Sequence, residues 1–393
     1  MGDALGSTYK AIDIFSGCGG VSCGLVLAGY QVKAAVEIDE TAVNTYLAYP
    51  PLSSVRVLRG SENGDIRKIN SMKLLETAGI QRDEIYLVAG CPPCQSFSYQ
   101  NPRNASKSND ERKALLFEFL RIIEELLPPF ILLENVPGIK SSYNQSILNE
   151  FLERMRLHYI VVDGILNAAD YGVPQIRKRY VLHAVRKDLH TLLVSGGRVF
   201  RLPTATHSNK KEDGLPSWRT AKEAIGDLPA IAAGQNFVDN EGNIINHRCA
   251  NLREVNLKRI RAIRANGGSR SGLPEEMVLD CHKKRDSNGR VFSGHSDVYG
   301  VMDADKPSPT MTAGCLFYSK GRYGHYSQDR AISIREAARL QTFPDDFCFN
   351  TSLASAAKQI GNAVPIKLVQ ESGFELKKSM RFLLEKSKIQ EAE

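Results

Sequence analysis

A strand, a glycine-rich turn, a helix and a second strand follow one another near the start of the chain. The apolar run 9–15 predicts the first strand, which ends at Ser16-Gly17-Cys18-Gly19-Gly20. A helix over about 21–28 and a strand over 32–38 come next, closing on Glu37. Because two parallel strands need a crossover connection, this order predicts an α/β fold around a parallel sheet.

The spacing of the glycines limits the ligand that such a turn can hold. A dinucleotide-binding turn would need glycine at 17, 19 and 22, but position 22 is Ser22. An acid about 20 residues after the turn can accept hydrogen bonds from ribose hydroxyls. A ligand with ribose and adenine but no phosphates, such as S-adenosylmethionine, fits better than a dinucleotide. A purely structural glycine corner is the alternative interpretation.

Two prolines form a stiff corner after the apolar run 85–88. The sequence there is Gly90-Cys91-Pro92-Pro93-Cys94, followed by about fifteen polar residues without an apolar period. A thiol held at the end of a strand beside a polar loop is typical of a nucleophile that is covered once substrate arrives. A redox pair of Cys91 and Cys94 is the alternative, but it leaves the charged residues described next without a function.

Charged side chains follow two later strands. Glu134 ends the apolar strand 130–136, where a carboxylate is costly unless it is paired or functional, and its surroundings should raise its pKa. A structural ion pair is the alternative. Gln175, Arg177 and Arg179 alternate along an extended stretch, so they should share one face. Two guanidinium groups on one face suit a carboxylate, a phosphate or a base carbonyl.

Other segments carry local structural signals. Asp65 either caps a helix near 71–78 or meets an adenine amino group, and the cap is favoured. An apolar stripe predicts a helix over 112–127, and strands are expected over 160–166 and 180–185. Ser333 and Glu336 form a capping box that starts a helix over 333–340. Further helices are expected over 352–359 and 366–384.

Length and composition exclude several classes of protein. A chain of 393 residues is too long for one ordinary core and suggests two domains. The start lacks an apolar signal segment, and no apolar stretch approaches 18 residues, so we expect a cytoplasmic protein with reduced cysteines and no membrane contact. The eight cysteines lack the paired spacing of a metal site, so no metal is expected. A net charge of +7 is compatible with a polyanionic partner but does not prove one.

Six segments resemble those of a known protein family and occur in the same order along the chain. The chain closely resembles the cytosine-C5 DNA methyltransferases in their bacterial form, over roughly residues 9–186 and 306–366. The matching segments are Phe15-Ser16-Gly17-Cys18-Gly19-Gly20, Pro92-Pro93-Cys94-Gln95, Glu134-Asn135-Val136, Gln175-Ile176-Arg177-Lys178-Arg179, the stretch 333–344 and Gly361-Asn362-Ala363-Val364-Pro365. Cys18 and Cys23, at the first of these segments, are a departure at positions where the family is permissive, and they are expected to be spectators.

The resemblance implies a fold, a cofactor and a domain plan. The expected fold is an α/β, Rossmann-like S-adenosylmethionine-dependent methyltransferase domain over 1–187 plus 355–393. An irregular mixed target-recognition domain, 188–354, would be inserted in it. Carried over by position, the cofactor-binding residues would be Phe15, Ser16, Gly17, Gly19, Gly20, Glu37, Ile38, Asp65, Ile66, Pro92, Asn362 and Val364.

The resemblance also implies a reaction on a cytosine flipped out of duplex DNA. Cys94 would add to C6, which makes C5 nucleophilic toward the methyl group of S-adenosylmethionine. Glu134 would contact N3 and the exocyclic amine, Arg179 would hold the O2 side, and Arg177 would steady the thiolate. Expected DNA contacts are Gln95, Ser96, Gln175, Arg270 and Arg290. The basic cluster Lys283-Lys284-Arg285 is either a solvated surface or a phosphate contact.

The same resemblance sets the expected partners. We expect a monomer that acts on double-stranded DNA, associates with the nucleoid through it, and releases S-adenosylhomocysteine. Its expected role is the modification component of a restriction-modification system, without a stable complex with the cognate endonuclease. A tRNA cytosine-C5 methyltransferase on the same fold and a catalytically silent DNA-binding relative are the alternatives.

Overall fold

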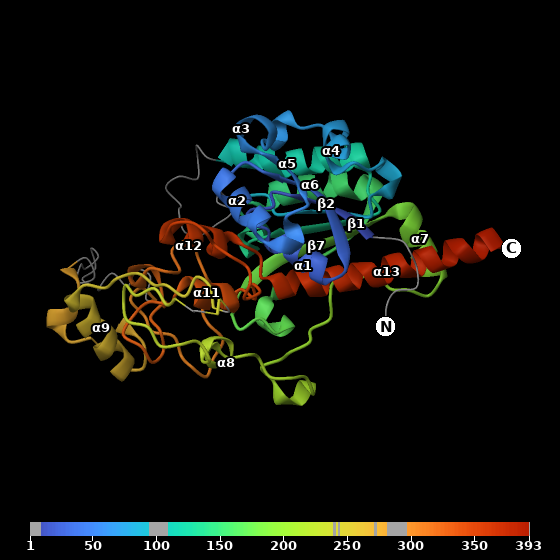
Figure 1. The fold of residues 1–393 in the computed structure, drawn as a ribbon. Helices are drawn as coiled ribbons and strands as arrows, with labels where there is room; N and C mark the ends of the chain where they lie inside the picture. The colour runs from blue at the N-terminus through green and yellow to red at the C-terminus, as the bar shows by residue number, and fades with distance from the viewer. Residues whose placement is uncertain are drawn as a thin grey trace. The chain divides into compact units, whose positions relative to one another are not determined.

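The chain folds into two compact units, one of them assembled from three separate stretches (Figure 1). The computed structural model describes residues 9–93, 109–238, 241–242, 244–270, 273–280 and 297–392. Unit 1 is built from the described parts of 1–171, 178–206 and 364–393. Unit 2 is built from those of 172–177 and 207–363.

Among the described residues, a seven-stranded sheet of order β3-β2-β1-β4-β5-β7-β6 forms the centre of unit 1. The strands are β1 (Tyr9–Ile14), β2 (Tyr30–Glu37), β3 (Arg56–Arg59), β4 (Leu87–Gly90), β5 (Phe130–Asn135), β6 (Tyr159–Asn167) and β7 (Lys178–Arg186). The first five pair in parallel, whereas β7 runs antiparallel between β5 and β6. The strand order reverses between β1 and β4, and ligands of open α/β sheets bind at the carboxyl ends of strands at such a point.

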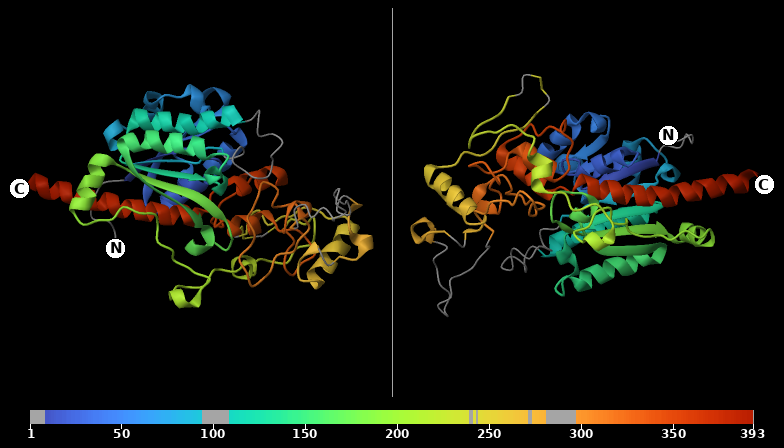
Figure 2. Two further views of the ribbon diagram at one scale, coloured as in Figure 1. Left: turned by 180° about the vertical axis from the view of Figure 1, so that it is seen from behind. Right: turned by 90° about the horizontal axis from the view of Figure 1, so that it is seen from below.

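Helices cover both faces of this sheet (Figure 2). One face packs α4 (Ser71–Ala78), α5 (Asn109–Leu126) and α6 (Gln145–His158), and the other packs α1 (Gly20–Leu27), α7 (Lys187–Ser195) and α13 (Ile366–Ala392). The short helices α2 (Glu40–Ala48) and α3 (Gly60–Asn63) follow β2 and β3. Every residue of β4 is buried, as expected for a strand covered on both sides. None of the helices described is both long and apolar enough to cross a membrane.

Most elements lie where the sequence predicts them. The strand–turn–helix–strand opening is present as β1, α1 and β2, so the expected α/β class is confirmed. Helix α12 runs to Asn362, three residues beyond its predicted end, because Gly361 still has helical geometry. Helix α13 continues to Ala392 rather than ending at 384. Helix ends are the least determined feature of a sequence pattern, since termini fray.

Unit 2 has little regular structure, as its composition predicts. The α-helices in its described part are α8 (Ala221–Ile225), α9 (Glu254–Ala265), α11 (Ile334–Leu340) and α12 (Leu353–Asn362). Its strand pairing, among the described residues, is limited to isolated bridges such as Asn236 with Arg248. A small core gathers Ile260, Ile263, Val301, Tyr318 and Ala331.

The units divide at 206/207 and 363/364 rather than at the expected 187/188 and 354/355. Residues up to 206 stay with unit 1 because Tyr171 Oη donates to Pro203 O (3.0 Å) and Thr206 N donates to Asp170 O (2.8 Å). Helix α12 packs on α11 inside unit 2. A change in composition marks where regular structure stops, but packing decides to which unit a segment belongs.

Candidate active site

The turn between β1 and α1 has a strained backbone. Phe15 has φ 63°, Gly17 φ 55° and Gly19 φ 101°. A non-glycine residue in the left-handed region costs about 1–3 kcal/mol, and such strain concentrates at binding sites. A side chain at Gly19 would run into Leu52 and Tyr46, whereas one at Gly17 would meet open space. The turn is therefore packed at Gly19 and open at Gly17.

Glu37, on the neighbouring strand β2, holds this turn through backbone hydrogen bonds to its carboxylate. Gly17 N donates to Glu37 Oε2 and Asp39 N to Glu37 Oε1, both at 2.8 Å. Burial raises the pKa of Glu37, and these backbone hydrogen bonds limit the rise. The next residue, Ile38, is exposed. That Glu37 also accepts ribose hydroxyls stays a prediction.

Asp65 caps a helix, but a different one from the helix expected. It accepts from Arg67 N at 3.1 Å at the start of the 3-10 turn Ile66–Lys68, while Asn70 caps α4. Asn70 directly precedes α4, so its side chain rather than that of Asp65 reaches the backbone N–H groups at the start of this helix. Arg67 also pairs with the Asp65 carboxylate at 2.7 Å, and its hydrogen bonds lower the pKa of Asp65. Ile66 is buried.

A small apolar pocket lies at the carboxyl ends of the central strands of unit 1. Gly90 and Cys91 from β4 and its end, Leu132 and Glu134 from β5, and Val181 from β7 line one part of it. The rest of the lining is Val21 from α1, and Val364, Leu368, Val369 and Ser372 from the C-terminal segment. Glu134 is thus the charged member of an apolar lining.

Glu134 and Arg179 form an ion pair at this pocket. Arg179 Nε lies 2.8 Å from Glu134 Oε1, and the two side chains are 11% and 12% exposed. The pairing follows from strand register, since Glu134 lies opposite Val181 in the antiparallel pair of β5 and β7. Each charge here lies largely out of water, so the pair holds both groups in one geometry. The predicted carboxylate and one of the two predicted arginines are brought together.

The proline corner is fixed as far as the structure describes it. Cys91 N donates to Ile14 O at 3.3 Å, and Asn135 Nδ2 donates to Pro92 O at 3.2 Å. These bonds tie the end of β4 to β1 and β5, so the corner has one orientation. The predicted nucleophile and its neighbours lie outside the described residues, as do two basic candidates. They are Cys94, Gln95, Ser96, Arg290 and the cluster Lys283-Lys284-Arg285.

Arg177 and Gln175 precede β7 and belong to unit 2. Arg177 is 1% exposed and donates to the carbonyl oxygens of Met311 (2.5 Å), Gly361 (2.8 Å) and Ala363 (3.0 Å). Gln175 is completely buried and donates to Leu340 O at 3.0 Å. The alternation predicted for 175, 177 and 179 therefore does not describe one strand face. A DNA contact from Gln175, whose side chain is completely buried, stays a prediction.

The remaining candidates differ in exposure. Val364 is buried in the pocket lining of unit 1, whereas Asn362 is exposed at the end of α12 in unit 2. Arg270 is partly exposed in unit 2. In the turn, Ser16 and Gly20 are buried and Gly20 starts α1.

The cysteines that the structure describes are not in disulfides. Burial raises the pKa of Cys18 and of Cys315 to about 12, so these thiols stay protonated near neutral pH. Cys18 and Cys23 are both buried, as spectators would be. Within the described stretches, no cluster of three or more His, Cys, Asp or Glu side chains is arranged to hold a metal.

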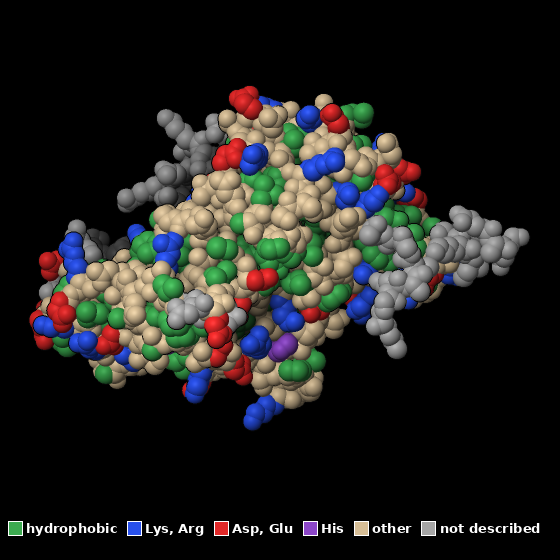
Figure 3. All heavy atoms as spheres, viewed as in Figure 1, with side chains coloured by type: hydrophobic (Ala, Val, Ile, Leu, Met, Phe, Trp, Pro, Cys, Tyr) green, Lys and Arg blue, Asp and Glu red, His purple; other side chains and the backbone are tan. Residues whose placement is uncertain are grey.

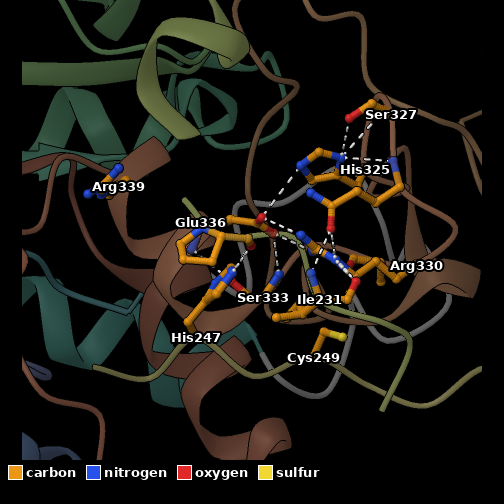
Figure 4. Close-up of polar contacts among 12 residues, drawn as sticks. Ile231, His247, Cys249, His325, Ser327, Arg330, Ser333, Glu336 and Arg339 are labelled. Atoms are coloured by element: carbon orange, nitrogen blue, oxygen red, sulfur yellow. Dashed lines mark hydrogen bonds and ion pairs between the residues drawn. The ribbon is translucent and has the colours of Figure 1, made fainter. Parts of the chain in front are cut away.

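A buried polar network in unit 2 was only half visible in the sequence (Figure 4). The predicted capping box is confirmed, since Ser333 N donates to Glu336 Oε2 at 2.7 Å. Arg330 adds two bonds to the same carboxylate, at 2.7 and 2.6 Å, and both residues are completely buried. His247 Nδ1 lies 2.9 Å from Ser333 Oγ. In the sequence, only the spacing of Ser333 and Glu336 indicated this network. Spacing identifies a helix cap, but it does not show whether the cap is buried.

Glu336→Gln is expected to destabilise unit 2 by about 3–5 kcal/mol, since it leaves Arg330 buried without its charge partner. Burial alone would raise the pKa of Glu336, but Arg330 outweighs it and the pKa lies below the usual 4.5. The stabilisation is therefore present above pH 4.5 and is lost as the pH falls through the lowered pKa. Urea unfolding followed by the fluorescence of Trp218 measures it, because this single tryptophan lies in unit 2.

Glu223→Gln is the matched control. Glu223 occupies the same position in the capping box of α8, but it is exposed. Its replacement should cost less than about 1 kcal/mol. Equal losses for the two variants would show that the buried ion pair contributes nothing beyond the cap.

Charge is dispersed on the face seen in Figure 3. Lysine and arginine side chains are interspersed there with aspartate and glutamate. In unit 2 the arginines of α9 are partly neutralised, since Arg261 and Arg264 both pair with Asp329, at 2.5 and 2.7 Å. Net charge alone therefore does not mark a binding surface on this face.

Comparisons with known proteins agree on one family. The family model described as C-5 cytosine-specific DNA methylase matches residues 9–378. A Type II methylase, M.HgiDII of Herpetosiphon aurantiacus, is 32% identical over 96% of this chain and 98% of its own length. The Type II methyltransferase M1.HphI of Haemophilus parahaemolyticus is 33% identical over 91% of this chain and 84% of its own.

Solved structures show the same architecture. A structure described as a DNA modification methyltransferase encoded within a prophage of E. coli superposes with a TM-score of 0.62 at 26% identity. It covers 95% of this chain and 100% of its own. The S. pombe Dnmt2 methyltransferase, at 17% identity and a TM-score of 0.55, covers 96% of this chain and 98% of its own, and it shares the fold.

Proposed function

The chain belongs to the C-5 cytosine-specific DNA methylase family, and from this premise we propose which of its residues carry out the reaction. It is a DNA cytosine-5 methyltransferase, and the family implies S-adenosylmethionine-dependent methylation. We propose Cys94 as the nucleophile and Glu134 with Arg179 as the pair that prepares the cytosine ring. The observation that carries this assignment is the Glu134–Arg179 ion pair in the pocket lined by Gly90 and Cys91.

The residues of unit 1 fit the cofactor. The turn is open at Gly17, and the apolar Ile38 is exposed directly after Glu37, as a face for adenine would be. Asp13 Oδ1 and Ser16 Oγ, at the same turn, are buried polar atoms without a hydrogen-bond partner. The residues proposed to hold the cofactor are Phe15, Ser16, Gly17, Gly19, Gly20, Glu37, Ile38, Asp65, Ile66, Pro92 and Val364. For Asn362, which unit 2 contains, cofactor binding remains a prediction.

The cofactor, when bound, supplies an electrophilic methyl group. The chain's own residues make the cytosine able to accept it. The Cys94 thiolate adds to C6, which turns C5 into a nucleophile. Glu134 holds the exocyclic amine and, in its protonated form, shares its proton with N3, so that the negative charge that develops on the ring is neutralised. After methylation the C5 proton leaves to water and the bond from Cys94 to C6 breaks, which restores the thiolate.

The two arginines have different proposed roles. Arg179 keeps Glu134 in place through its 2.8 Å contact and is positioned to hold O2 of the base. Arg177 is a positioning residue, because its three backbone acceptors come from two segments of unit 2, one at 311 and the other at 361 and 363. It would steady the reacting groups through these segments rather than by touching the base.

The biological role follows from the relatives. Type II methylases are among the most similar proteins, so we propose that this enzyme is the modification component of a bacterial restriction-modification system. We further propose that it works as a monomer on double-stranded DNA in the cytoplasm, without a metal and without a stable endonuclease complex. S-adenosylhomocysteine is the proposed product.

The substrate can be tested directly. Incubation with labelled S-adenosylmethionine should label duplex DNA and leave tRNA unlabelled. Bisulfite sequencing of DNA from a host that expresses the protein should then show protection of one cytosine in a fixed sequence context. Labelling of tRNA alone would contradict the proposed substrate, and labelling of neither would support a catalytically silent relative.

A further inference from the structure

A buried carboxyl group lies beneath the cofactor turn, and the proposed reaction does not use it. Asp13, on β1, is completely buried. Ser22 Oγ donates to its Oδ2 at 2.6 Å, and Tyr46 Oη donates to Ser22 Oγ at 2.8 Å. Ser22 occupies the position where a dinucleotide-binding turn would have its third glycine. The three side chains link β1, α1 and α2 around the turn.

Two polar atoms at this turn lack partners. Asp13 Oδ1 and Ser16 Oγ are both buried, and neither has a hydrogen bond. An unsatisfied buried polar group costs about 1–3 kcal/mol, so it calls for an explanation. Ser16 belongs to the segment proposed to bind the cofactor, and Asp13 precedes that segment by two residues. A bound ligand, or the adjustment of the turn on binding, would satisfy the two atoms.

The surroundings of Asp13 hold no compensating cation. Its neighbours across the sheet are Ala35 and Ala89, and in the described residues no lysine, arginine or histidine pairs with it. Glu37, on β2, adds a second negative charge. The helices that approach Asp13 bring no charge to it, since α1 contributes the hydroxyl of Ser22 and α2 contributes the phenol of Tyr46, beside which lies the thiol of Cys23. Cys18, in the turn itself, stays protonated near neutral pH.

Asp13 is therefore partly protonated and partly ionised near neutral pH. Burial raises its pKa from 3.8 to about 7, an effect that hydrogen bonds from Ser22 oppose and the charge of Glu37 reinforces. A positive ligand nearby favours the ionised carboxylate, and it does so strongly where water is excluded. The methyl donor carries a positive sulfonium, whereas the product carries a neutral thioether at the same place.

We propose that Asp13 is a charge-selecting positioning residue, which favours the sulfonium donor over the thioether product and releases a proton when the donor binds. Ser22 and Tyr46 hold the carboxyl in place beneath the turn. This inference rests on the proposed assignment of the turn to the cofactor. Its consequence is that the enzyme exchanges spent product for fresh donor more readily at higher pH.

Titration calorimetry with S-adenosylmethionine and S-adenosylhomocysteine tests the proposal without turnover. At pH 7, in phosphate and in Tris, the wild type should release protons on binding the donor and fewer on binding the product. The affinity ratio of donor to product should rise about fivefold between pH 6 and pH 8, as expected if the donor lowers the pKa of Asp13 by about one unit. Asp13→Asn should lose most of this rise. Ionisation of the ligands themselves is common to both proteins and cancels in the comparison.

Two further variants make the test specific. Glu40→Gln, which alters an exposed carboxylate of α2, should behave as the wild type. Tyr46→Phe removes the hydroxyl that supports Ser22, so it should move the midpoint of the pH dependence upward. This variant decides the question if Asp13→Asn does not fold, and an unchanged midpoint would then overturn the proposal.

Different outcomes would contradict the role of Asp13 and the proposed cofactor site. Binding of donor and product with the same ratio at both pH values, in the wild type as in Asp13→Asn, would overturn the role of Asp13. Failure of the wild type to bind either ligand would instead overturn the proposed cofactor site.

Discussion

Replacing Cys94 by serine is expected to reduce methyl transfer to DNA by about 10⁴-fold or more, as loss of a covalent nucleophile does in other enzymes. The reaction needs a thiolate at neutral pH, and the serine hydroxyl stays protonated there and adds poorly to C6. Labelled S-adenosylmethionine with duplex DNA measures the rate. Covalent capture of 5-fluorocytosine DNA, from which fluorine does not leave as a proton does, should occur with the wild type and not with Cys94→Ser.

Cys91→Ser is the matched control, because it makes the same chemical change three residues earlier. Cys91 lines the pocket, and its backbone N–H is tied to β1. Serine retains the size and the backbone bond, so the rate should stay within about threefold of the wild type, a loss below 1 kcal/mol. If Cys91→Ser abolished capture while Cys94→Ser retained it, the nucleophile would be assigned to the wrong thiol.

Glu134→Gln is expected to lower kcat by about 10²–10⁴-fold with a much smaller effect on DNA binding. Glutamine has the same shape and still donates a hydrogen bond, but it does not exchange a proton with N3 as the ring gains charge. Single-turnover methylation, with DNA affinity measured separately, distinguishes the two effects. The pocket position of Glu134 predicts that the loss appears in the chemical step.

The ion pair between Glu124 and Arg154 provides the control for this prediction. It also belongs to unit 1, with an N···O distance of 2.5 Å, but it links α5 to α6 away from the pocket lining. Glu124→Gln should change the rate by less than about threefold, because a pair that remains partly in contact with solvent contributes about 0–1 kcal/mol and this one lies outside the pocket lining. An equal fall in kcat for both variants would mean that lost stability, rather than lost chemistry, explains the effect of Glu134→Gln.

Local patterns in the sequence were sufficient for much of the fold. Apolar runs of four to seven residues identified the strands other than β3, and the capping box of Ser333 and Glu336 identified the start of α11. The cap of α4 was assigned to Asp65 instead of Asn70, because both residue types cap helices and only the observed backbone selects between them. Local signals therefore located elements well and resolved their ends less well.

The partners of the charged residues were harder to predict from the sequence. The alternation of 175, 177 and 179 suggested one shared face, yet β7 begins at Lys178, and Arg177 binds carbonyl oxygens of unit 2. Arg330 was not recognised as the partner of Glu336, nor Ser22 as the donor to Asp13. These contacts join residues from different elements, and periodicity within one element carries no information about them.

The sequence by itself determined the α/β class, the order of the elements and the residue types available for the reaction, because these depend on local periodicity and on which side chains are present. Only the tertiary structure decided which of them meet. The antiparallel insertion of β7 beside β5 places Arg179 against Glu134, and hydrogen bonds from Tyr46 of α2 to Ser22 of α1 and from Ser22 to Asp13 join three elements beneath the turn. Register and packing are long-range properties, so they are settled only when the whole sheet and its covering helices are in place.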